Sequence, residues 1–211
     1  MVKFLVDNGA KDLPLSYAVE RGNLQIIKFL IEKGANIFEF DNQPIKNAIS
    51  MGSIEICDYL VKKGVDIRFE DDCLLTIAID QNNLEMVKYL ISKGADVHAK
   101  NDYAIQIASD NGNFEMVKFL VENGADIRVD DEYPLRTAIL HNDFDLVKYF
   151  VENGANIDVK DKSPLKLACE RGYFEIAKYL IEQGVDIHID NDSLLSVAVK
   201  ANNLELVKYL V

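Results

Sequence analysis

The sequence predicts an all-α repeat solenoid in which helix–turn–helix units stack on one another. Glycines recur every 30 residues, and alanines recur with the same period in a second register. Each period holds two apolar patterns of helical spacing and one short polar stretch. A pair of short helices cannot cover its own apolar stripe, so it has to pack against the next pair. The recurring residues are Gly34, Gly64, Gly94, Gly124, Gly154 and Gly184, and Ala18, Ala48, Ala78, Ala108, Ala138, Ala168 and Ala198.

The first helix of each unit is short, as residues 134–163 show. Leu135, Ala138 and Ile139 fall at i, i+3 and i+4, and Pro134 suits the first helical position. This helix must end near position 142, where the copies contain only the two residues that best accept left-handed backbone. They read Gly22, Gly52, Asn82, Gly112, Asn142, Gly172 and Asn202.

The second helix begins one residue later. In six of seven copies that residue has a side chain that can accept hydrogen bonds from exposed backbone N–H groups, so it is predicted to be an N-cap. The seven are Asn23, Ser53, Asn83, Asn113, Asp143, Tyr173 and Asn203. The helix then buries an apolar face that includes Leu146, Val147 and Phe150, and it ends at the recurring glycine.

The connection to the next unit is predicted to be a short hairpin loop. In "NIDVKDKS", the strand-like Ile157 and Val159 precede a tight turn that always begins with Asp or Asn. These turn residues are Asp41, Asp71, Asn101, Asp131, Asp161 and Asn191.

We therefore expect one array over residues 1–211. It opens with a partial repeat, 1–13, and closes with another, 194–211. The complete repeats between them are 14–43, 44–73, 74–103, 104–133, 134–163 and 164–193.

These residues resemble ankyrin repeats over essentially the whole chain. "SPLKLACERGYFEIAKYLIEQGVDI", from Ser163 to Ile187, is similar to the family's T-P-L-H-x-A…G-H-x-E-V-V…L-L-x-x-G-A-D-V pattern, and the match recurs in six copies. The period is 30 residues where the family usually has 33, which implies a shorter hairpin finger. This period and the second-helix style "N-L-E-M-V-K-Y-L" are most similar to the ankyrin proteins of giant amoeba viruses. The resemblance implies a protein-interaction module that binds a protein partner through a concave groove of hairpin tips and first helices.

Composition excludes several classes of function. The formal net charge is −12, which repels nucleic acid and anionic membranes. No signal peptide or membrane-spanning run is present, so an intracellular location is expected. Cys57, Cys73 and Cys169 form no metal or disulfide pattern, and Cys57 and Cys169 occupy core positions. No cofactor or metal site is predicted.

The sequence also argues against an enzyme. Asp130, Asp131 and Glu132 are adjacent acids, but side chains that follow one another on a turn diverge, and a stack of helix pairs offers no deep pocket. The three histidines come from separate repeats and have no nucleophile beside them.

The candidate protein-binding residues lie just before the Gly/Asn position that ends each first helix. By the family pattern these pairs face the groove, and their chemistry differs between repeats, with only Glu20–Arg21 and Glu170–Arg171 alike. Met51, Leu140 and His141 are the favoured anchors because exposed apolar or aromatic groups are typical of binding hot spots. Plain solvent exposure would also let these positions vary, and this alternative stays open. The selected residues are Met51, Asp80, Gln81, Asp110, Asn111, Leu140, His141, Glu170 and Arg171.

Two further side-chain series follow the repeat. The turn acids would line up about 10 Å apart as an acidic ridge suited to a basic partner segment, unless they serve turn geometry alone. These are Asp41, Asp71, Asp72, Asp102, Asp131, Glu132, Asp161, Asp190 and Asp192. The mid-helix aromatics are predicted to stack in the core: Phe29, Tyr59, Tyr89, Phe119, Tyr149, Tyr179 and Tyr209.

An alternative function is a structural spacer or adaptor in a longer protein, linked for example to an F-box or BTB domain that it presents to host factors. The chain opens and closes inside second helices, and neither end shows a polar capping repeat. Either the array continues in a longer protein, or its uncapped ends self-associate or pair with another molecule.

Overall fold

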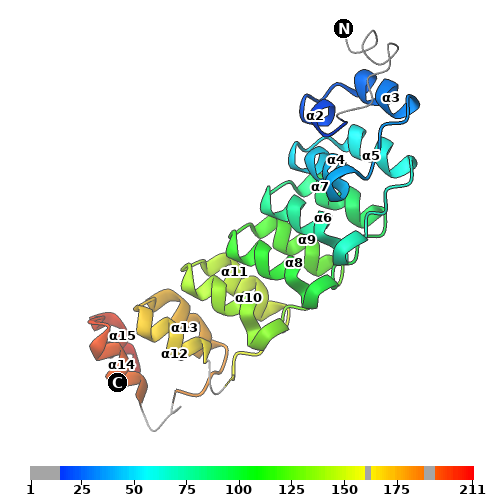
Figure 1. The fold of residues 1–211 in the computed structure, drawn as a ribbon. Coiled ribbons are helices and arrows are strands. Elements are labelled where there is room, and N and C mark those ends of the chain that lie inside the picture. Colours follow the sequence, from blue (N-terminus) through cyan, green and yellow to red (C-terminus); the bar gives the residue numbers. More distant parts are fainter. Residues whose placement is uncertain (1–14, 160–162, 188–192) are drawn as a thin grey trace. The chain divides into compact units, whose positions relative to one another are not determined.

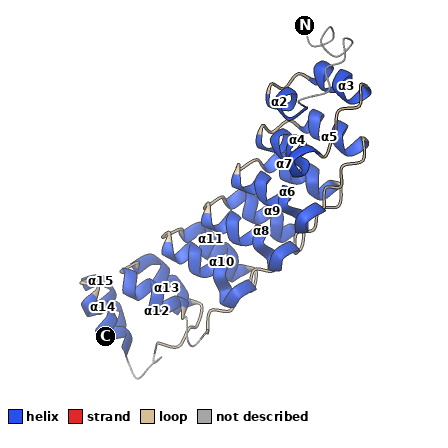
Figure 2. Cartoon of the chain, viewed as in Figure 1, coloured by secondary structure: helices blue, strands red, loops and turns tan. Residues whose placement is uncertain are grey.

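The computed structural model describes residues 15–159, 163–187 and 193–211. These residues form helices joined by turns and contain no strand (Figure 1, Figure 2). The chain divides into two compact units, 1–99 and 100–211, and each is described by itself. The predicted partial repeat 1–13 lies outside the described residues.

Helices of two kinds alternate along both units. The first unit contains α2 (Leu15–Glu20), α3 (Leu24–Glu32), α4 (Glu39–Ser50), α5 (Ile54–Lys62), α6 (Phe69–Asp80) and α7 (Leu84–Ser92). Helix α8 (Ala99–Asp110) starts on the last residue of the first unit and otherwise belongs to the second. The second unit also contains α9 (Phe114–Glu122), α10 (Val129–Leu140), α11 (Phe144–Glu152), α12 (Pro164–Arg171), α13 (Phe174–Glu182), α14 (Ser193–Lys200) and α15 (Leu204–Leu210).

Within each unit the helix pairs stack on one another. First helices contact first helices, α2 with α4 and α4 with α6, and likewise α10 with α12 and α12 with α14. Second helices follow the same rule, α11 with α13 and α13 with α15. Leu60, Leu90 and Phe150, which share one position of the repeat, are 0% exposed. Burying each such side chain stabilises the folded state by about 1.5–3 kcal/mol. The predicted fold class, an all-α solenoid of stacked helix pairs, is confirmed.

Left-handed residues follow all seven first helices and six of the seven second helices that the structure describes, as predicted. The seven Gly and Asn residues that follow the first helices have φ between 53° and 71°. The six glycines that follow the second helices have φ between 91° and 108°. A residue with a Cβ atom is strained in this region, so the repeating Gly and Asn are a backbone requirement.

The six predicted polar N-caps are also confirmed. In each, a side-chain oxygen accepts from the backbone N–H three residues on, at 3.0–3.4 Å. Tyr173 makes no such bond. The Asn203 side-chain amide makes two hydrogen bonds. Its Oδ1 accepts from the backbone N–H of Leu206, and its Nδ2 donates to the carbonyl oxygen of Gly172 at 2.8 Å. One cap therefore starts a helix and ties it to the preceding repeat.

The predicted hairpin strands are wrong. Each fully described connection is a short left-handed turn: Phe40, Asp41 and Asn42 have φ of 46°, 58° and 60°, and 100–102 and 130–132 repeat this backbone. The strand-like pattern reflects burial, since Ile67, Val97 and Ile127 are at most 7% exposed. The connection between helices is too short to form two paired strands. The later turns, at 160–162 and 188–192, lie outside the described residues.

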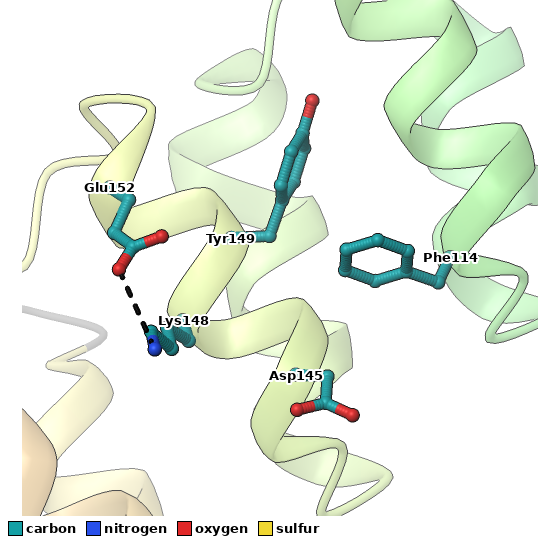
Figure 3. Close-up of a pocket in the computed structure, with 5 residues that line it drawn as sticks. All are labelled: Phe114, Asp145, Lys148, Tyr149 and Glu152. Carbon is teal, nitrogen blue, oxygen red and sulfur yellow. Dashed lines mark ion pairs between the residues drawn. The ribbon is translucent and has the colours of Figure 1, made fainter.

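The aromatic series needs a smaller correction. These rings lie at the edge of the core, half-buried for Phe29 to Tyr179 and 41% exposed for Tyr209. In the second unit each tyrosine meets a phenylalanine of the preceding repeat. Phe114 and Tyr149, shown in Figure 3, make an edge-to-face contact with ring centroids 5.3 Å apart.

The cysteines behave as core residues. All three are free, and Cys57 and Cys169 are fully buried, as predicted. Burial, reinforced by the neighbouring Asp58, raises the pKa of Cys57 to about 12, and burial with Glu170 does the same for Cys169. Both thiols therefore stay protonated at neutral pH and are poor nucleophiles.

Gly94→Val should lower the melting temperature. A Cβ at Gly94 meets no atom within 4 Å, so the substitution tests the left-handed backbone (φ 96°) without a clash. The strain of about 1–2 kcal/mol corresponds to roughly 2–8 °C for a chain of this size. Thermal unfolding followed by circular dichroism measures it. Gly94→Asn, which tolerates this backbone, should lose less, and equal melting temperatures for both variants would contradict the assignment.

Candidate protein-binding groove

The candidate residues lie where the first helices end. Met51, Gln81 and His141 are the C-cap residues of α4, α6 and α10. Each is followed by the left-handed residue and the N-cap of the next helix, so the chain reverses just beyond it. All nine candidates are exposed, with Met51 at 46% and Leu140 at 38%. Three belong to the first unit and six to the second.

Three of these residues contact the framework, Asp110 next to the following first helix and Met51 and Leu140 in neighbouring repeats. The Tyr133 hydroxyl lies 3.0 and 3.1 Å from the two carboxylate oxygens of Asp110. Burial, and then the charge of Asp110, raise the pKa of Tyr133, so it remains a donor. The Met51 methyl group lies 3.4 Å from the point where Gly22 would carry a Cβ. The Leu140 carbonyl accepts from the Tyr173 hydroxyl at 3.4 Å. Beside these contacts, the side chains of Met51 and Leu140 remain exposed to solvent.

Exposed aromatics were missed by the sequence reasoning. Tyr17 is 66% exposed, Phe38 50%, Phe40 77% and Tyr103 45%. They lie on first helices or on the turns before them. One signal pointed to Tyr103, because it stands at the position where the ankyrin pattern has Thr. No comparable signal pointed to Phe40, which lies in the left-handed turn before the first helix (φ 46°).

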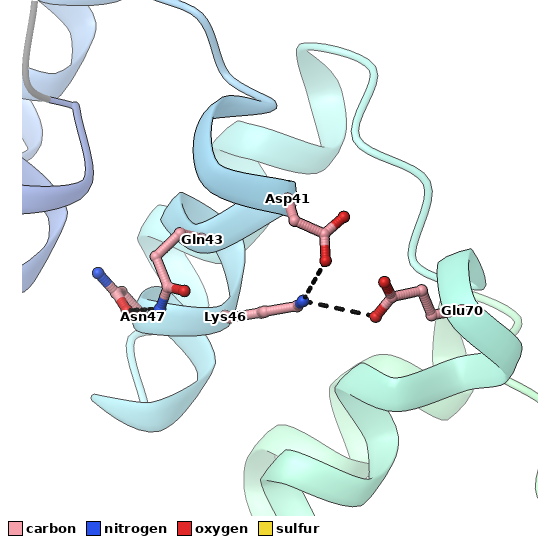
Figure 4. Close-up of polar contacts among 5 residues, drawn as sticks. All are labelled: Asp41, Gln43, Lys46, Asn47 and Glu70. Atoms are coloured by element: carbon pink, nitrogen blue, oxygen red, sulfur yellow. Dashed lines mark hydrogen bonds and ion pairs between the residues drawn. The ribbon is translucent and has the colours of Figure 1, made fainter.

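Polar contacts link successive turns at the start of the first helices (Figure 4). The Lys46 ammonium lies 3.2 Å from Asp41 and 3.4 Å from Glu70, and it sits 5.2 Å from the Phe69 ring centroid. Its hydrogen bond to Asp41 lowers the pKa of that carboxyl. On the same helix, the side-chain oxygen of Asn47 accepts a hydrogen bond from the Gln43 amide, one turn earlier, at 2.6 Å. Lys46 thus partly neutralises the acidic turns of the first unit.

The predicted acidic ridge is wrong for three of its members. Asp72, Asp102 and Glu132 are only 5%, 9% and 4% exposed. Asp72 accepts from the backbone N–H of Asp96 at 3.0 Å, and Asp102 accepts from that of Asp126 at 2.8 Å. These acids therefore hold the next turn of the stack. Asp41 and Asp131 are exposed, whereas Asp161, Asp190 and Asp192 lie outside the described residues and the Asp71 side chain is not described.

Glu132 occupies the same turn position in an unfavourable environment, because its Oε2 atom is buried with no hydrogen-bond partner. Burial raises its pKa above the ordinary 4.5, while a backbone hydrogen bond from Asn156 and the charge of Arg128 act the other way. Arg128 in turn donates through Nε to the Gly154 carbonyl at 2.9 Å. The turn is thus built around a carboxyl that burial disfavours as an anion.

Among the described residues, no three His, Cys, Asp or Glu side chains come together as a metal ion would require. None of the described helices is both long and apolar enough to cross a lipid bilayer. The features that vary from repeat to repeat are exposed side chains at helix ends and turns.

The fold and this surface define a helical repeat scaffold, a class of protein that generally binds other proteins. The sequence model for ankyrin repeats in three copies matches residues 1–71, 17–101, 75–161 and 135–211, which together cover the chain. The protein belongs to the ankyrin-repeat family. No curated protein matches the sequence.

Among solved structures, the chain is similar to the ankyrin repeat domain of Bcl-3, described as a unique member of the IkappaB protein family. The TM-score is 0.74 at 23% identity, over 94% of this chain and 99% of that one. At this identity the likeness concerns the fold alone.

Glu132→Gln should change how stability depends on pH. Because the folded-state pKa is raised, the native state binds more protons than the unfolded state near and above pH 4.5, and stability falls as pH rises through the folded pKa. Glutamine cannot ionise, so the variant should match the wild type near pH 4 and exceed its melting temperature at pH 7. The exposed neighbour Asp131→Asn serves as control. A difference between Glu132→Gln and wild type that does not grow with pH would contradict the buried-carboxyl interpretation.

Proposed function

We propose that the chain is a protein-interaction module that binds a protein partner through the groove side of its first helices and turns. Membership in the ankyrin family supports a binding role in general. The specific support is the pattern of variation: framework positions repeat every 30 residues, while the pairs before the left-handed residues take six different forms in seven copies. We propose the same nine residues as contacts, together with residues 1–211 as a single array with the repeat boundaries given above.

Met51 and Leu140 are the anchors of this proposal. Both are apolar and exposed, and both lie at the end of a first helix. Burying such a side chain in a complex contributes about 1.5–3 kcal/mol. A rigid position adds to this because less freedom is lost on binding. His141, beside Leu140, supplies a ring that can stack and donate.

The groove favours a partner with mixed chemistry. Lys46 pairs with the turn acids Asp41 and Glu70, and three further turn acids are buried. The turns of the described residues therefore present less negative charge than the sequence suggested. These turns are therefore less suited to a basic partner segment than the sequence indicated.

The alternative is a spacer or adaptor segment that presents another domain, such as an F-box or BTB domain, to host factors. The full-length gene discriminates between the two: an appended domain favours the adaptor. Three free cysteines favour a reducing compartment, so we propose an intracellular site of action.

Met51→Arg combined with Leu140→Arg should weaken partner binding at least tenfold and leave the melting temperature nearly unchanged, because both side chains are exposed. Partners would be captured on the wild-type chain from lysate of an amoeba, the host implied by the viral resemblance. Mass spectrometry would identify them, and each affinity would then be measured on purified protein.

The control pair is Ile54→Arg with Leu204→Arg, which makes the same change at exposed apolar residues that begin second helices (36% and 65% exposed). Equal weakening by both pairs, or a matching loss of folding in the groove pair, would count against the groove.

A further inference from the structure

Lysine side chains cover the aromatic rings of the second helices in the first unit. The Lys63 ammonium lies 5.4 Å from the Tyr59 centroid, and Lys93 lies 5.4 Å from that of Tyr89. Lys33 sits 5.6 Å from Phe29 in the same way. In each case the lysine is the C-cap residue of the helix and reaches back over the ring four residues earlier. The chain itself therefore shows that this ring position accepts a cation.

The second unit has the same rings, but no lysine stands at the C-cap positions of its second helices α9, α11 and α13. The equivalent C-cap residues are Asn123, Asn153 and Gln183. The side-chain amides of Asn123 and Asn153 donate to the carbonyls of Phe119 and Tyr149 at 2.8 Å. In the part of the chain that the structure describes, no Lys or Arg lies over the rings of Phe119, Tyr149 or Tyr179.

Phenylalanines fix the orientation of the tyrosines in this unit. Phe114 meets Tyr149 edge-on, and Phe144 meets Tyr179 with centroids 5.5 Å apart. The equivalent residues of the first unit, Leu24, Ile54 and Leu84, are aliphatic. Beside the first of these pairs lies an open depression of about 270 Å³ lined by Phe114, Asp145, Lys148, Tyr149 and Glu152. Figure 3 shows the Phe114 and Tyr149 rings lying next to one another, with Asp145 on the same helix as Tyr149.

The charges around these rings are mainly negative. Burial raises the pKa of Tyr149 and of Tyr179, and the nearby carboxylates of Glu122 and Glu152, respectively, raise it further. Lys148 is 3.8 Å from Glu152, a loose pair between two exposed groups. Asp145 has no ion-pair partner among the described residues. Helices α9, α11 and α13 contain six acids and three lysines, a net charge of −3. Helices α3, α5 and α7 with their C-cap residues contain four acids and six lysines, a net charge of +2.

We propose that the second-helix surface of the second unit binds a basic segment of a protein partner, with one Lys or Arg side chain over Tyr149 and another over Tyr179. We call this surface, defined by Phe114, Tyr149, Phe144, Tyr179, Glu122 and Glu152, the tyrosine face. The partner's cations take the place that Lys63 and Lys93 occupy in the first unit. The acids supply charge complementarity, and the rings supply the position.

The repeat sets the spacing of the partner's cations. Neighbouring packed helices are about 10 Å apart, and an extended chain advances about 3.3 Å per residue. Two cations on successive rings are therefore about three residues apart, as in K/R-x-x-K/R. This surface is separate from the groove residues, so the inference does not depend on the proposed groove.

The test supplies the missing lysines from within the chain. The probe is a fluorescein-labelled peptide of repeating Gly-Ser-Lys, with Gly-Ser-Glu as its matched negative, titrated by fluorescence anisotropy at physiological salt. The variant is Asn153→Lys with Gln183→Lys, which copies the C-cap residues of the first unit. It should fold, because the backbone of Asn153 (φ −93°, ψ 11°) resembles that of Lys63 (φ −86°, ψ 0°).

We expect the wild type to bind the lysine peptide and not the glutamate peptide. The lysine variant should bind it about tenfold more weakly, since each exposed cation–π contact corresponds to roughly a three- to fivefold change. Ile54→Lys with Val199→Lys adds the same charge away from the tyrosine face and should weaken binding by less than about threefold. Conversely, Lys93→Asn uncovers the Tyr89 ring in the first unit and should strengthen binding. Tyr59 is not used for this test, because Lys28 lies over its ring as well as Lys63.

Two results would overturn the inference: no binding of the lysine peptide by the wild type, or equal weakening by the two lysine pairs, which would mean general charge attraction only. The groove pair Met51→Arg with Leu140→Arg should act on peptide binding no more than the Ile54 and Val199 pair. Failure of the groove proposal and failure of the tyrosine face are thus distinguishable.

Discussion

Left-handed backbone at fixed places is the constraint on which the rest of this fold depends. Left-handed residues follow each first helix and every second helix but the last, and they recur in the described turns between repeats. Gly or Asn at the first place turns the chain so that the next residue can cap a new helix. The recurring glycine then frees the chain to cross to the neighbouring unit. Only with these reversals can helices of six to twelve residues present their apolar faces to one another.

The sequence predicts such local features well because their causes are local. Asn142 and Asp143 fix a helix end and a helix start through their own backbone and side-chain preferences, and the structure has both. The turns are different. Asp72 and Glu132 look like exposed turn acids in the sequence, but their burial is decided by the turn of the next unit, which lies 24 residues away and covers them. No pattern within the turn distinguishes a solvated carboxylate from one that holds a neighbour's N–H group.

The failed hairpin has a similar explanation. An apolar residue at every second position in "IRVD" or "IDVK" is typical of a strand, and the same spacing also suits a loop that buries alternate side chains. Ile127 and Val129 are buried against the stack, and the residues after them turn left-handed. The exposure of the nine groove candidates could be predicted, because a residue at a helix end before a reversal points outward. Whether they contact a partner does not follow from the backbone.

The tyrosine face could not be predicted from the sequence, because a half-buried tyrosine and a core tyrosine have the same sequence spacing.

The asparagine that both caps a helix and reaches the preceding glycine has a consequence for how such a chain can evolve. Asn203 bonds Gly172, 31 residues before it, and Asn83 has its amide nitrogen beside Gly52 across the same interval. Because the interval is the same, excising or duplicating one whole repeat keeps equivalent positions paired across the stack. Gain or loss of complete repeats therefore preserves the register. Insertions or deletions of any other length shift it, which gives a physical reason for the thirty-residue spacing of the glycines from Gly34 to Gly184.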